Sequence, residues 1–329
     1  MPTRDACDAF RYSGGSEGHY ESYFLRANHP ARPAAFWLRY TMFCPRGAPE
    51  RALGELWAVY FDGDAHRIAA ARSVVPLAQC SFSEHELAVR IGSASLDQES
   101  LQGRAESGPT RIAWQLRYTS PASPLLLLPA RMYATRLPKA KALVSSPFAA
   151  FDGELQVDGE RVSVAGWVGS QNHNWGSQHT DRYAWGQVAS FDGAPEAFLE
   201  CATASLRVGR FLTPPLSPIV LRLGDEEFAW NGLLRSLRTR ARYRPFTWHL
   251  SAEDARARIE VELDGRAEDF IALPYDNPPG GQKICLNSKL ASCRVVLTRP
   301  ERPPLTLYTR TRAAFEILQD NEIPGIARL

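Results

Sequence analysis

Short runs in which apolar and polar residues alternate recur along nearly the whole chain, and they constrain its fold more than any other feature. Alternation with a period of two places every second side chain on the same face of a β-strand. Gly, Pro, Asn and Asp residues separate the runs. The runs are Ala35 to Phe43, Glu55 to Asp62, Glu86 to Ser95, Arg111 to Tyr118, Glu154 to Trp167, Arg182 to Phe191, Ala197 to Val208, Ile219 to Leu223, Phe246 to Leu250, Ala257 to Leu263, Cys293 to Thr298 and Leu305 to Thr309. The pattern predicts an all-β fold.

Turn signals and the lack of helix signals favour an antiparallel arrangement. Asp158-Gly159 lies between two alternating runs, and this dipeptide is a strong signal for a β-hairpin. Asp264-Gly265 repeats the signal later in the chain. No window of twelve or more residues keeps an apolar stripe of helical period behind a capping residue, so we expect few and short helices. With 24 prolines and 23 glycines between short strands, a sandwich or barrel is favoured over a βαβ arrangement.

The length of the chain predicts two domains or one double-length β architecture, because 329 residues exceed what one small sandwich or barrel requires. A Pro-rich and basic stretch from Pro121 to Pro147, which includes Lys139 and Lys141, is the expected boundary. We therefore predict an N-terminal β-domain over residues 1–147 and a C-terminal β-domain over residues 148–329.

The charge balance argues against polyanionic partners. The 38 Lys and Arg residues nearly match the 36 Asp and Glu residues, and the net charge is +2, so binding of nucleic acid is not expected. One local exception is the arginine-dense run Leu233 to Arg244, which alternates from Arg238 onward. This pattern suits one solvated face of a strand, and an anion site is the alternative.

Cysteine spacing and hydropathy indicate the cellular compartment. The six cysteines are scattered and form no C-x-x-C pair, which argues against a zinc ribbon or a thioredoxin-like redox site. The first fifteen residues contain no apolar signal-peptide core, and the longest aliphatic run, Leu125 to Leu128, is too short to span a bilayer. We expect a cytoplasmic protein with reduced cysteines and without stable membrane insertion.

One stretch, Trp167 to Gln187, interleaves aromatic rings with amide and imidazole groups, and this mixture suits a pocket for a mostly apolar small molecule. Its first motif is Asn172-His173-Asn174-Trp175-Gly176. Asn and Gly tolerate turn geometry, and His can donate, accept or change charge near neutral pH. The alternative interpretation is a polar turn between two strands, with Trp175 plugging the end of a barrel.

The second motif of this stretch is a strand on which Tyr183, Trp185 and Gln187 share one face, opposite the small residues Ala184 and Gly186. This face combines a phenol, an indole and an amide, and it would make a wall for a flat or polyene-like ligand. Tyr183 would be able to donate a proton. Ordinary core packing is the alternative.

Acidic side chains supply candidates for proton transfer. Glu200 shares a strand face with Phe198, which predicts an acid among apolar neighbours. Burial disfavours the charged form of a carboxyl group and primes it as a general acid at neutral pH. Exposure at a barrel rim is the alternative for Glu200, and also for Asp181 and Glu21.

The sequence lacks the motifs for metal binding, nucleophilic catalysis and phosphate binding. His173 and His179 are six residues apart, which fits neither a helical pair nor a short strand with an obvious third ligand, so we expect no metal. The chain contains no G-x-S-x-G nucleophile motif and no phosphate-binding loop. These patterns therefore indicate neither nucleophilic catalysis nor binding of a phosphate-bearing cofactor in a glycine-rich loop.

Two places resemble a known superfamily. Tyr20-Glu21-Ser22-Tyr23-Phe24 resembles an acid followed by aromatics on the family's first strand, and Asn172-His173-Asn174-Trp175-Gly176 before Tyr183-Ala184-Trp185 resembles an Asp-His-x-Trp-Gly turn before a Trp-bearing strand. The chain is thus similar to the tandem lipocalin-like proteins. These include bacterial carotenoid 1,2-hydratases, AttH-type proteins, tocopherol cyclases, and certain fungal Diels-Alderases and phytoalexin hydratases.

The resemblance implies two calycin-type antiparallel β-barrels or curved sheets in tandem, an apolar pocket, and no metal or organic cofactor. It also implies chemistry by protonation of an alkene or by positioning of a reactive polyene. The chain departs from the hydratases at two positions: Asn172 replaces an aspartate that is thought to be the acid, and Ser170 replaces a tyrosine. An amide cannot deliver a proton as a carboxylic acid can, so another group would have to act as the acid.

The leading hypothesis is a cofactor-independent enzyme for hydration, cyclisation or isomerisation of an apolar isoprenoid or polyketide-like molecule. The rivals are a non-catalytic carrier of hydrophobic metabolites and an interaction module whose aromatic strand is core. In the enzyme, the rings of Trp175 and Trp185 would stabilise developing positive charge. The expected catalytic residues are His173, Glu200, Tyr183 and Asp181, and the expected substrate-binding residues are Glu21, Tyr23, Asn172, Asn174, Trp175, Trp185 and Gln187.

Overall fold

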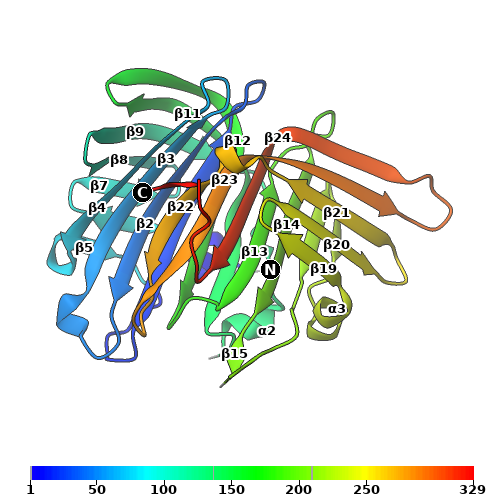
Figure 1. The fold of residues 1–329 in the computed structure, drawn as a ribbon, viewed down its shortest axis with the longest axis horizontal. Helices are drawn as coiled ribbons and strands as arrows, with labels where there is room; N and C mark the ends of the chain where they lie inside the picture. Colours follow the sequence, from blue (N-terminus) through cyan, green and yellow to red (C-terminus); the bar gives the residue numbers. More distant parts are fainter. Residues whose placement is uncertain (1, 136, 209) are drawn as a thin grey trace.

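The structure is a computed structural model that describes residues 2–135, 137–208 and 210–329. Over these residues the chain forms two large, mainly antiparallel β-sheets that lie side by side, with only short helices (Figure 1). The predicted all-β class is confirmed. The helices are α1 (Arg4–Asp8), α2 (Ala130–Tyr133) and α3 (Leu233–Arg238), with 3-10 turns at Pro49–Arg51, Leu77–Gln79 and Ala267–Asp269.

The first sheet holds twelve of the described strands and runs in the order β4-β3-β2-β1-β12-β11-β9-β8-β7-β6-β5, with β10 paired to β11. Its strands are β1 (His19–Asn28), β2 (Ala34–Cys44), β3 (Leu53–Asp62), β4 (Arg67–Pro76), β5 (Cys80–Phe82), β6 (Ala88–Ile91), β7 (Ala94–Asp97), β8 (Ser100–Ser107), β9 (Thr110–Thr119), β10 (Leu125–Leu126), β11 (Ala140–Val157) and β12 (Glu160–Gly176).

The first sheet curls until β4 meets β8 and β9, so that it forms a nearly closed barrel. Side chains bridge the gap: Ser107 Oγ accepts from the backbone N of Arg72 and donates to its carbonyl O, both at 3.1 Å. Inside lies an apolar core whose largest members include Phe36, Trp114, Phe151 and Trp167. The barrel interior is therefore filled by side chains.

The second sheet holds eleven strands and runs in the order β18-β17-β14-β13-β24-β23-β21-β20-β19, with β22 between β23 and β25. A small hairpin, β15–β16, stands apart from it. The strands are β13 (Arg182–Val188), β14 (Ala197–Ser205), β15 (Arg207–Val208), β16 (Phe211–Leu212), β17 (Ile219–Leu223), β18 (Glu226–Ala229), β19 (Arg240–Arg244), β20 (Thr247–Glu253), β21 (Arg258–Asp264), β22 (Ile271–Asp276), β23 (Gln282–Thr298), β24 (Leu305–Gln319) and β25 (Ala327–Arg328).

The two Asp-Gly signals have different outcomes. Asp158 and Gly159 both have positive φ angles, 51° and 91°, and they join β11 to β12 as predicted. The hairpin predicted at Asp264-Gly265 is wrong, because the chain leaves β21 through a 3-10 turn before β22. A side chain at Gly265 would lie 2.6 Å from the ring of Phe270, so close packing accounts for this glycine.

Other strand predictions differ in detail. The run Glu86 to Ser95 forms a hairpin, β6–β7, instead of one strand, because Gly92 adopts a positive φ of 58° between the two. In β19 the side chains of Arg240, Arg242 and Arg244 are exposed, in agreement with the solvated-face interpretation. The division expected at residue 147 falls inside β11, which pairs with β9 and β12 of the first sheet. The change of sheet occurs between Gly176 and Arg182.

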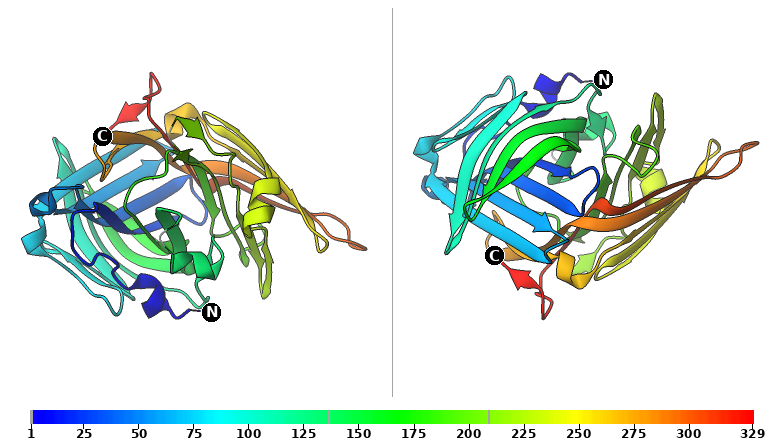
Figure 2. Two further views of the ribbon diagram at one scale, coloured as in Figure 1. Left: turned by 90° about the horizontal axis from the view of Figure 1, so that it is seen from below. Right: turned by 90° about the horizontal axis from the view of Figure 1, so that it is seen from above.

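The two sheets pack against each other through a third apolar cluster. The first sheet contributes Trp37 and Trp57, and the second contributes Leu273, Tyr275 and Leu318. Figure 2 shows the sheets in contact from two sides, and Figure 1 shows the C-terminal segment lying against the first sheet. None of the helices in the described part of the chain has the length and apolar character needed to cross a membrane. All six cysteines are unpaired.

Candidate functional site

Strand β12 separates two polar clusters, because neighbouring residues of a strand point to opposite faces. His173 lies opposite Tyr23, whose side chain packs into the core of the first barrel. Asn172 lies opposite Phe24, on the face that meets the second sheet. The site residues expected from the sequence therefore divide between the two sides of one strand.

We name the two groups by their central residues. The Glu200 cluster lies between the sheets and comprises Arg26, Ser170, Asn172, Trp185, Gln187 and Glu200. The His173 cluster lies on the barrel side of β12 and comprises Asp8, His19, Glu21, Tyr23 and His173.

In the Glu200 cluster, two neutral donors hold the carboxyl group of Glu200. Trp185 Nε1 donates to Glu200 Oε1 at 2.7 Å, and Gln187 Nε2 donates to Glu200 Oε2 at 2.8 Å. The alternation of β13 and β14 produces this arrangement, since Gln187 lies opposite Glu200 in the paired strands. The predicted shared face of Tyr183, Trp185 and Gln187 points toward the first sheet.

Gln187 connects Glu200 to a buried arginine. Its Oε1 accepts from Arg26 Nε and from Ser170 Oγ, each at 2.7 Å, and its Nε2 also donates to Asn172 Oδ1 at 2.9 Å. Asn172 Nδ2 in turn donates to Ser170 Oγ at 2.8 Å. These bonds fix the orientation of both amides. An amide at position 172 can donate and accept here, which a carboxylate cannot do.

Burial governs the ionisation of the Glu200 cluster. The Glu200 side chain is only 2% exposed, and burial raises its pKa to about 7, although the bonds from Trp185 and Gln187 and the charge of Arg26 oppose the rise. Burial likewise lowers the pKa of Arg26 to about 10. A carboxyl group with a pKa near neutrality can both give and take a proton at physiological pH.

A second buried acid lies nearby on β24. Glu316 Oε1 accepts from Lys289 Nζ at 2.8 Å and from Asn287 Nδ2 at 2.9 Å. Its Oε2 accepts from the Tyr183 hydroxyl at 3.4 Å. Burial lowers the pKa of Lys289 and raises that of Tyr183, so the phenol keeps its proton.

Between these charged groups lies a partly open aromatic surface. The Phe24 ring stands edge-on to Trp185, with 5.8 Å between their centroids. Phe24 and Tyr183 are only half-buried, although each belongs to a strand that is paired on both sides, and Trp185 keeps 8% exposure. Phe24 and Tyr183 therefore keep part of their aromatic surface exposed, and Phe24 contacts the buried ring of Trp185.

Polar atoms without partners face the same region. Trp37 Nε1, Arg39 Nε and Asn174 Oδ1 are buried and have no hydrogen-bond partner. The register pairs Arg39 with Phe24 and Trp37 with Arg26, and it places Asn174 two residues from Asn172 on the same face of β12. Buried polar groups are nearly always satisfied in native proteins, so these unsatisfied atoms indicate places for a polar ligand group or water.

The His173 cluster is a closed ion-pair network. His173 Nε2 lies 2.8 Å from Glu21 Oε1, and His173 Nδ1 lies 2.7 Å from the carbonyl O of Cys7. Both ring nitrogens therefore face acceptors. Burial alone would raise the pKa of Glu21, but its bonds to His173 and His19 outweigh burial and hold the pKa below the ordinary value.

The resulting pair joins the His173 imidazole ring to the Glu21 carboxyl group, and both side chains are fully buried. The backbone N of Arg11 donates to both Glu21 oxygens at 3.0 Å, and the Tyr23 hydroxyl donates to the carbonyl O of Asp8 at 2.9 Å. Both ring nitrogens of His173 are thus occupied by contacts within the protein, and neither is free to contact a ligand.

Two expected site residues lie elsewhere. Asp181 precedes β13, and its Oδ2 accepts from the backbone N of Arg207 at 2.6 Å, so it joins neither cluster. Trp175 packs with Cys7 and Leu143 on the barrel side of β12, and the guanidinium of Arg11 lies 4.8 Å from its ring centroid.

The indole rings expected to stabilise positive charge already contact cations. Lys289 Nζ lies 5.7 Å from the ring centroid of Trp185 and 5.8 Å from that of Trp37. One face of Trp185 is therefore paired with a resident ammonium group.

The sequence interpretation missed several residues of the region between the sheets. Period two places Phe24, Arg26 and Asn28 on one face of β1, so an arginine on the same strand face as Phe24 was an available signal. Lys289 and Glu316 carried no such signal, because their meeting depends on the pairing of β23 with β24. The other residues missed were Trp37 and Arg39.

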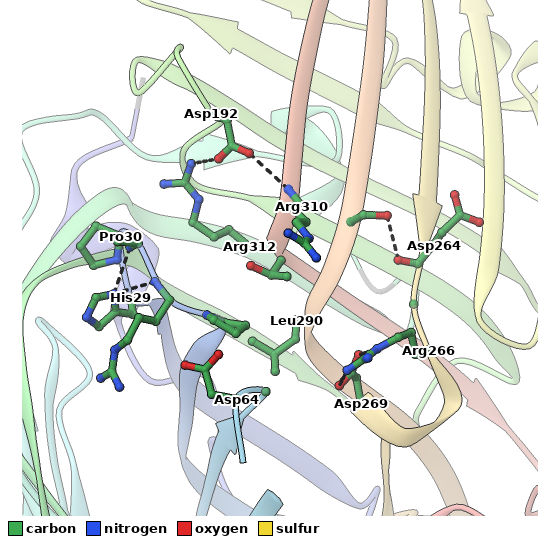
Figure 3. A pocket seen from close by; sticks show the side chains of 17 residues that line it. His29, Pro30, Asp64, Asp192, Asp264, Arg266, Asp269, Leu290, Arg310 and Arg312 are labelled. Atoms are coloured by element: carbon green, nitrogen blue, oxygen red, sulfur yellow. Dashed lines mark hydrogen bonds and ion pairs between the residues drawn. The ribbon is translucent and has the colours of Figure 1, made fainter. Parts of the chain in front are cut away.

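A cavity of about 680 Å³ opens at the rim between the two sheets (Figure 3). The cavity adjoins the end of β1. Asn28, the last residue of β1, donates from Nδ2 to the carbonyl O of Lys289 at 2.7 Å, and Leu290, which follows Lys289, lines the cavity. Its walls are charged and paired: Asp192 bonds Arg312, and Asp269 bonds Arg266. The Glu200 and His173 side chains do not line it.

No three His, Cys, Asp or Glu side chains among the described residues form a group that could hold a metal ion. His179 lies apart from His173 and stacks on Tyr20, with 4.1 Å between the ring centroids. Burial lowers the pKa of His179 to about 3.

Comparison with curated sequences gives distant relatives. No family model matches the chain. A protein of Mycobacterium tuberculosis, described as uncharacterised in two strains, is 25% identical over 287 residues, which cover 86% of this chain and 82% of the relative.

Comparison with solved structures identifies the fold. A putative AttH from Nitrosomonas europaea aligns with a TM-score of 0.57 at 11% identity, covering 98% of this chain and 100% of the other. Kievitone hydratase from Nectria haematococca aligns at 0.53 and 11% identity, covering 92% and 89%. CghA, solved with Sch210972, aligns at 0.57 and 11% identity, covering 98% and 97%. The chain therefore has the tandem lipocalin-like fold that the resemblance in its sequence implied.

Proposed function

We propose that the chain is a cofactor-independent enzyme that protonates an apolar isoprenoid or polyketide-like small molecule, leading to hydration, cyclisation or isomerisation. The observation that carries the proposal is the buried carboxyl group of Glu200. Its pKa is about 7, and it lies behind Trp185, beside the accessible surface of Phe24 and Tyr183. Half of such a group holds a proton near pH 7, which suits a general acid.

The proposed step transfers the proton of Glu200 to a carbon–carbon double bond. The π electrons form the new C–H bond, and a carbocation remains on the neighbouring carbon. The Glu200 carboxylate that results is stabilised by the Trp185 and Gln187 donors and, through Gln187, by Arg26. Water then adds to the cation and releases a proton, or loss of a proton from carbon completes a cyclisation or isomerisation.

The surrounding side chains suit this chemistry. Phe24 and Trp185 offer apolar contact area, and the amide of Asn174 presents a buried oxygen without a partner, able to accept from a hydroxyl group of the ligand. In this proposal His173 and Glu21 stabilise β12 from its other face. Asp181 takes no part in the reaction.

The rival proposal is a carrier that binds the same molecules without turnover. It is favoured by one observation: both Glu200 oxygens and both polar atoms of the Gln187 side chain already have partners within the protein. In a carrier, the only role of the Glu200 carboxyl group and the Gln187 amide would be to join the two sheets.

Solvent deuterium separates the two proposals. The purified protein is incubated in D₂O with pools of linear isoprenoids and polyenes, and mass spectrometry follows deuterium bound to carbon. We expect incorporation by the wild type and a loss of about 10²- to 10⁴-fold in Glu200→Gln, with ligand binding retained by tryptophan fluorescence. Glu196→Gln, an exposed acid just before β14, is the matched control. Binding without incorporation by the wild type would identify a carrier.

A further inference from the structure

Large apolar side chains on the surface gather at one edge of the molecule. Among the described residues, eight large hydrophobic side chains are exposed, and six of them belong to three short segments. Single exposed apolar residues are ordinary, whereas a group of them marks an interaction surface. The six are Leu137, Phe211, Leu212, Leu233, Leu234 and Leu237.

The three segments lie together in space. Figure 1 shows α2, the β15 hairpin and α3 along the lower edge of the molecule. Figure 2 (left), seen from below, shows α2 and α3 on the side toward the viewer. Leu137 follows α2, Phe211 and Leu212 form β16, and the three remaining leucines belong to α3. We call this set the lower-edge surface.

Helix α3 presents its leucines outward. At about 100° per residue, Leu233, Leu237 and Leu234 fall within one sector, with Arg238 and Arg235 next to it. The opposite side is anchored, since Ser236 is buried and its carbonyl O accepts from the backbone N of Ser217 at 3.0 Å. Leu234 is 68% exposed. The helix is thus held by one side and offers an apolar strip bordered by arginines.

The charge of these segments is unlike that of the rest of the chain. Residues 121–151, 201–224 and 228–252 contain four, three and five Lys or Arg residues, respectively, and no Asp or Glu. All 36 acids lie in the remaining sequence, with only 26 Lys and Arg residues. A protein with a net charge of only +2 therefore concentrates positive charge in the segments that carry its exposed leucines.

We propose that the lower-edge surface docks on a bilayer that contains anionic lipids. Leucine and phenylalanine side chains enter the boundary between headgroups and acyl chains, while arginines remain at the level of the lipid phosphates. The excess of positive charge in these segments complements the negative surface of such a membrane. Three of the arginines, Arg207, Arg222 and Arg235, already pair with Asp181, Glu227 and Asp254, so the remaining exposed cations of these segments face the lipid. Docking is peripheral and reversible, and it holds whether the chain is an enzyme or a carrier.

Vesicle flotation tests the proposal with the full-length protein. Vesicles of phosphatidylcholine alone are compared with vesicles that contain about 30% phosphatidylserine, at low salt and at about 0.5 M NaCl. We expect binding to the anionic vesicles only, weakened at least severalfold by salt, because exposed charges are screened over short distances.

Two variants and one control assign the binding to the lower-edge surface. The double variant Leu234→Ser with Leu237→Ser removes the apolar strip, and Arg238→Gln with Arg240→Gln removes charge. Each should weaken vesicle binding about tenfold. Val74→Ser changes a comparably exposed apolar residue on β4 and should leave binding unchanged. Circular dichroism confirms that the variants are folded.

Three outcomes would overturn the proposal. The first is a lack of binding to anionic vesicles by the folded wild type. The second is binding that the leucine and arginine variants leave unchanged. The third is a dimer in solution that the leucine variant converts to a monomer without any effect on vesicle binding, which would assign the lower-edge surface to a second copy of the chain.

Discussion

The two polar clusters on either side of β12 each bury a glutamate, but the pKa of Glu21 is lowered whereas that of Glu200 is raised. Glu21 contacts the His173 ring directly, and its bonds to His173 and His19 hold its pKa below the ordinary value. Glu200 has no ion pair among those the described residues form, and neutral amide and indole donors separate it from Arg26. A directly paired carboxylate contributes to structure, whereas an acid buried behind neutral donors keeps a pKa near neutrality and can exchange its proton.

The largest effect in this comparison is expected for His173→Ala. The substitution leaves the Glu21 carboxylate buried without its main partner, and loss of one member of a buried ion pair costs about 3–5 kcal/mol of the free energy of unfolding. Urea denaturation at pH 7 measures it. His85→Ala, at an exposed position, should change stability by less than about 0.5 kcal/mol. A stable His173→Ala protein that has lost turnover would place the imidazole in the reaction instead.

The next effect concerns the pH dependence of stability. The pKa of Glu200 rises from an ordinary 4.5 to about 7 on folding, so the folded state binds this proton more tightly than the unfolded state. The Glu200 contribution is thus fully present below pH 4.5 and is lost as the pH rises to 7. The lost stability is on the order of 3 kcal/mol.

Denaturation curves over this pH range measure the effect as the difference between the wild type and Glu200→Gln. The glutamine variant lacks the titrating group, so its stability should decline less between pH 4.5 and 7. Parallel pH profiles for the two proteins would show that Glu200 ionises normally and would remove the basis for its role as an acid.

A smaller effect is expected for Asn172→Asp, which places an acid next to Gln187. Gln187 Nε2 bonds both Asn172 Oδ1 and Glu200 Oε2, so the new carboxylate would lie close to Glu200. Like charges disfavour each other's ionised form, and the pKa of Glu200 should rise by about one pH unit. Carboxyl ¹³C NMR titration measures the change, and an unchanged midpoint would show that the two groups do not interact.

The smallest effect distinguishes two asparagines on the same face of β12. Asn174→Leu removes an oxygen that has no partner, so stability should change by less than about 1 kcal/mol. Asn172→Leu breaks bonds to Gln187 and Ser170 and should cost about 1–3 kcal/mol. Thermal denaturation compares the pair. Equal losses would mean that the amide at position 174 is also part of the hydrogen-bonded network.

The sequence was sufficient to predict the class of fold and most strands, because alternation reports directly which face of a strand is buried. It also placed Tyr183, Trp185 and Gln187 on one face, and the structure agrees. The same rule places Asn172 and His173 on opposite faces. A local cluster of chemical groups in a sequence therefore need not be a cluster in space.

Long-range features were beyond the sequence. The partners of Glu316 and Glu21 come from residues 27 and 152 positions away, and no local pattern reports such meetings. The position of a sheet boundary is also a long-range feature, because the proline and lysine at positions 147 and 141 belong to the long hairpin β11–β12 of the first barrel.

The hydrogen bonds at the start of the chain have a consequence for the order of folding. Strand β1 pairs with β12, and the carbonyl O of Cys7 bonds the ring of His173. A ribosome must therefore synthesise β12 before β1 can find its second neighbour in the sheet. Until then β1 keeps one edge without a neighbouring strand. Synthesis through Gly176 supplies β12 and allows the first barrel to form.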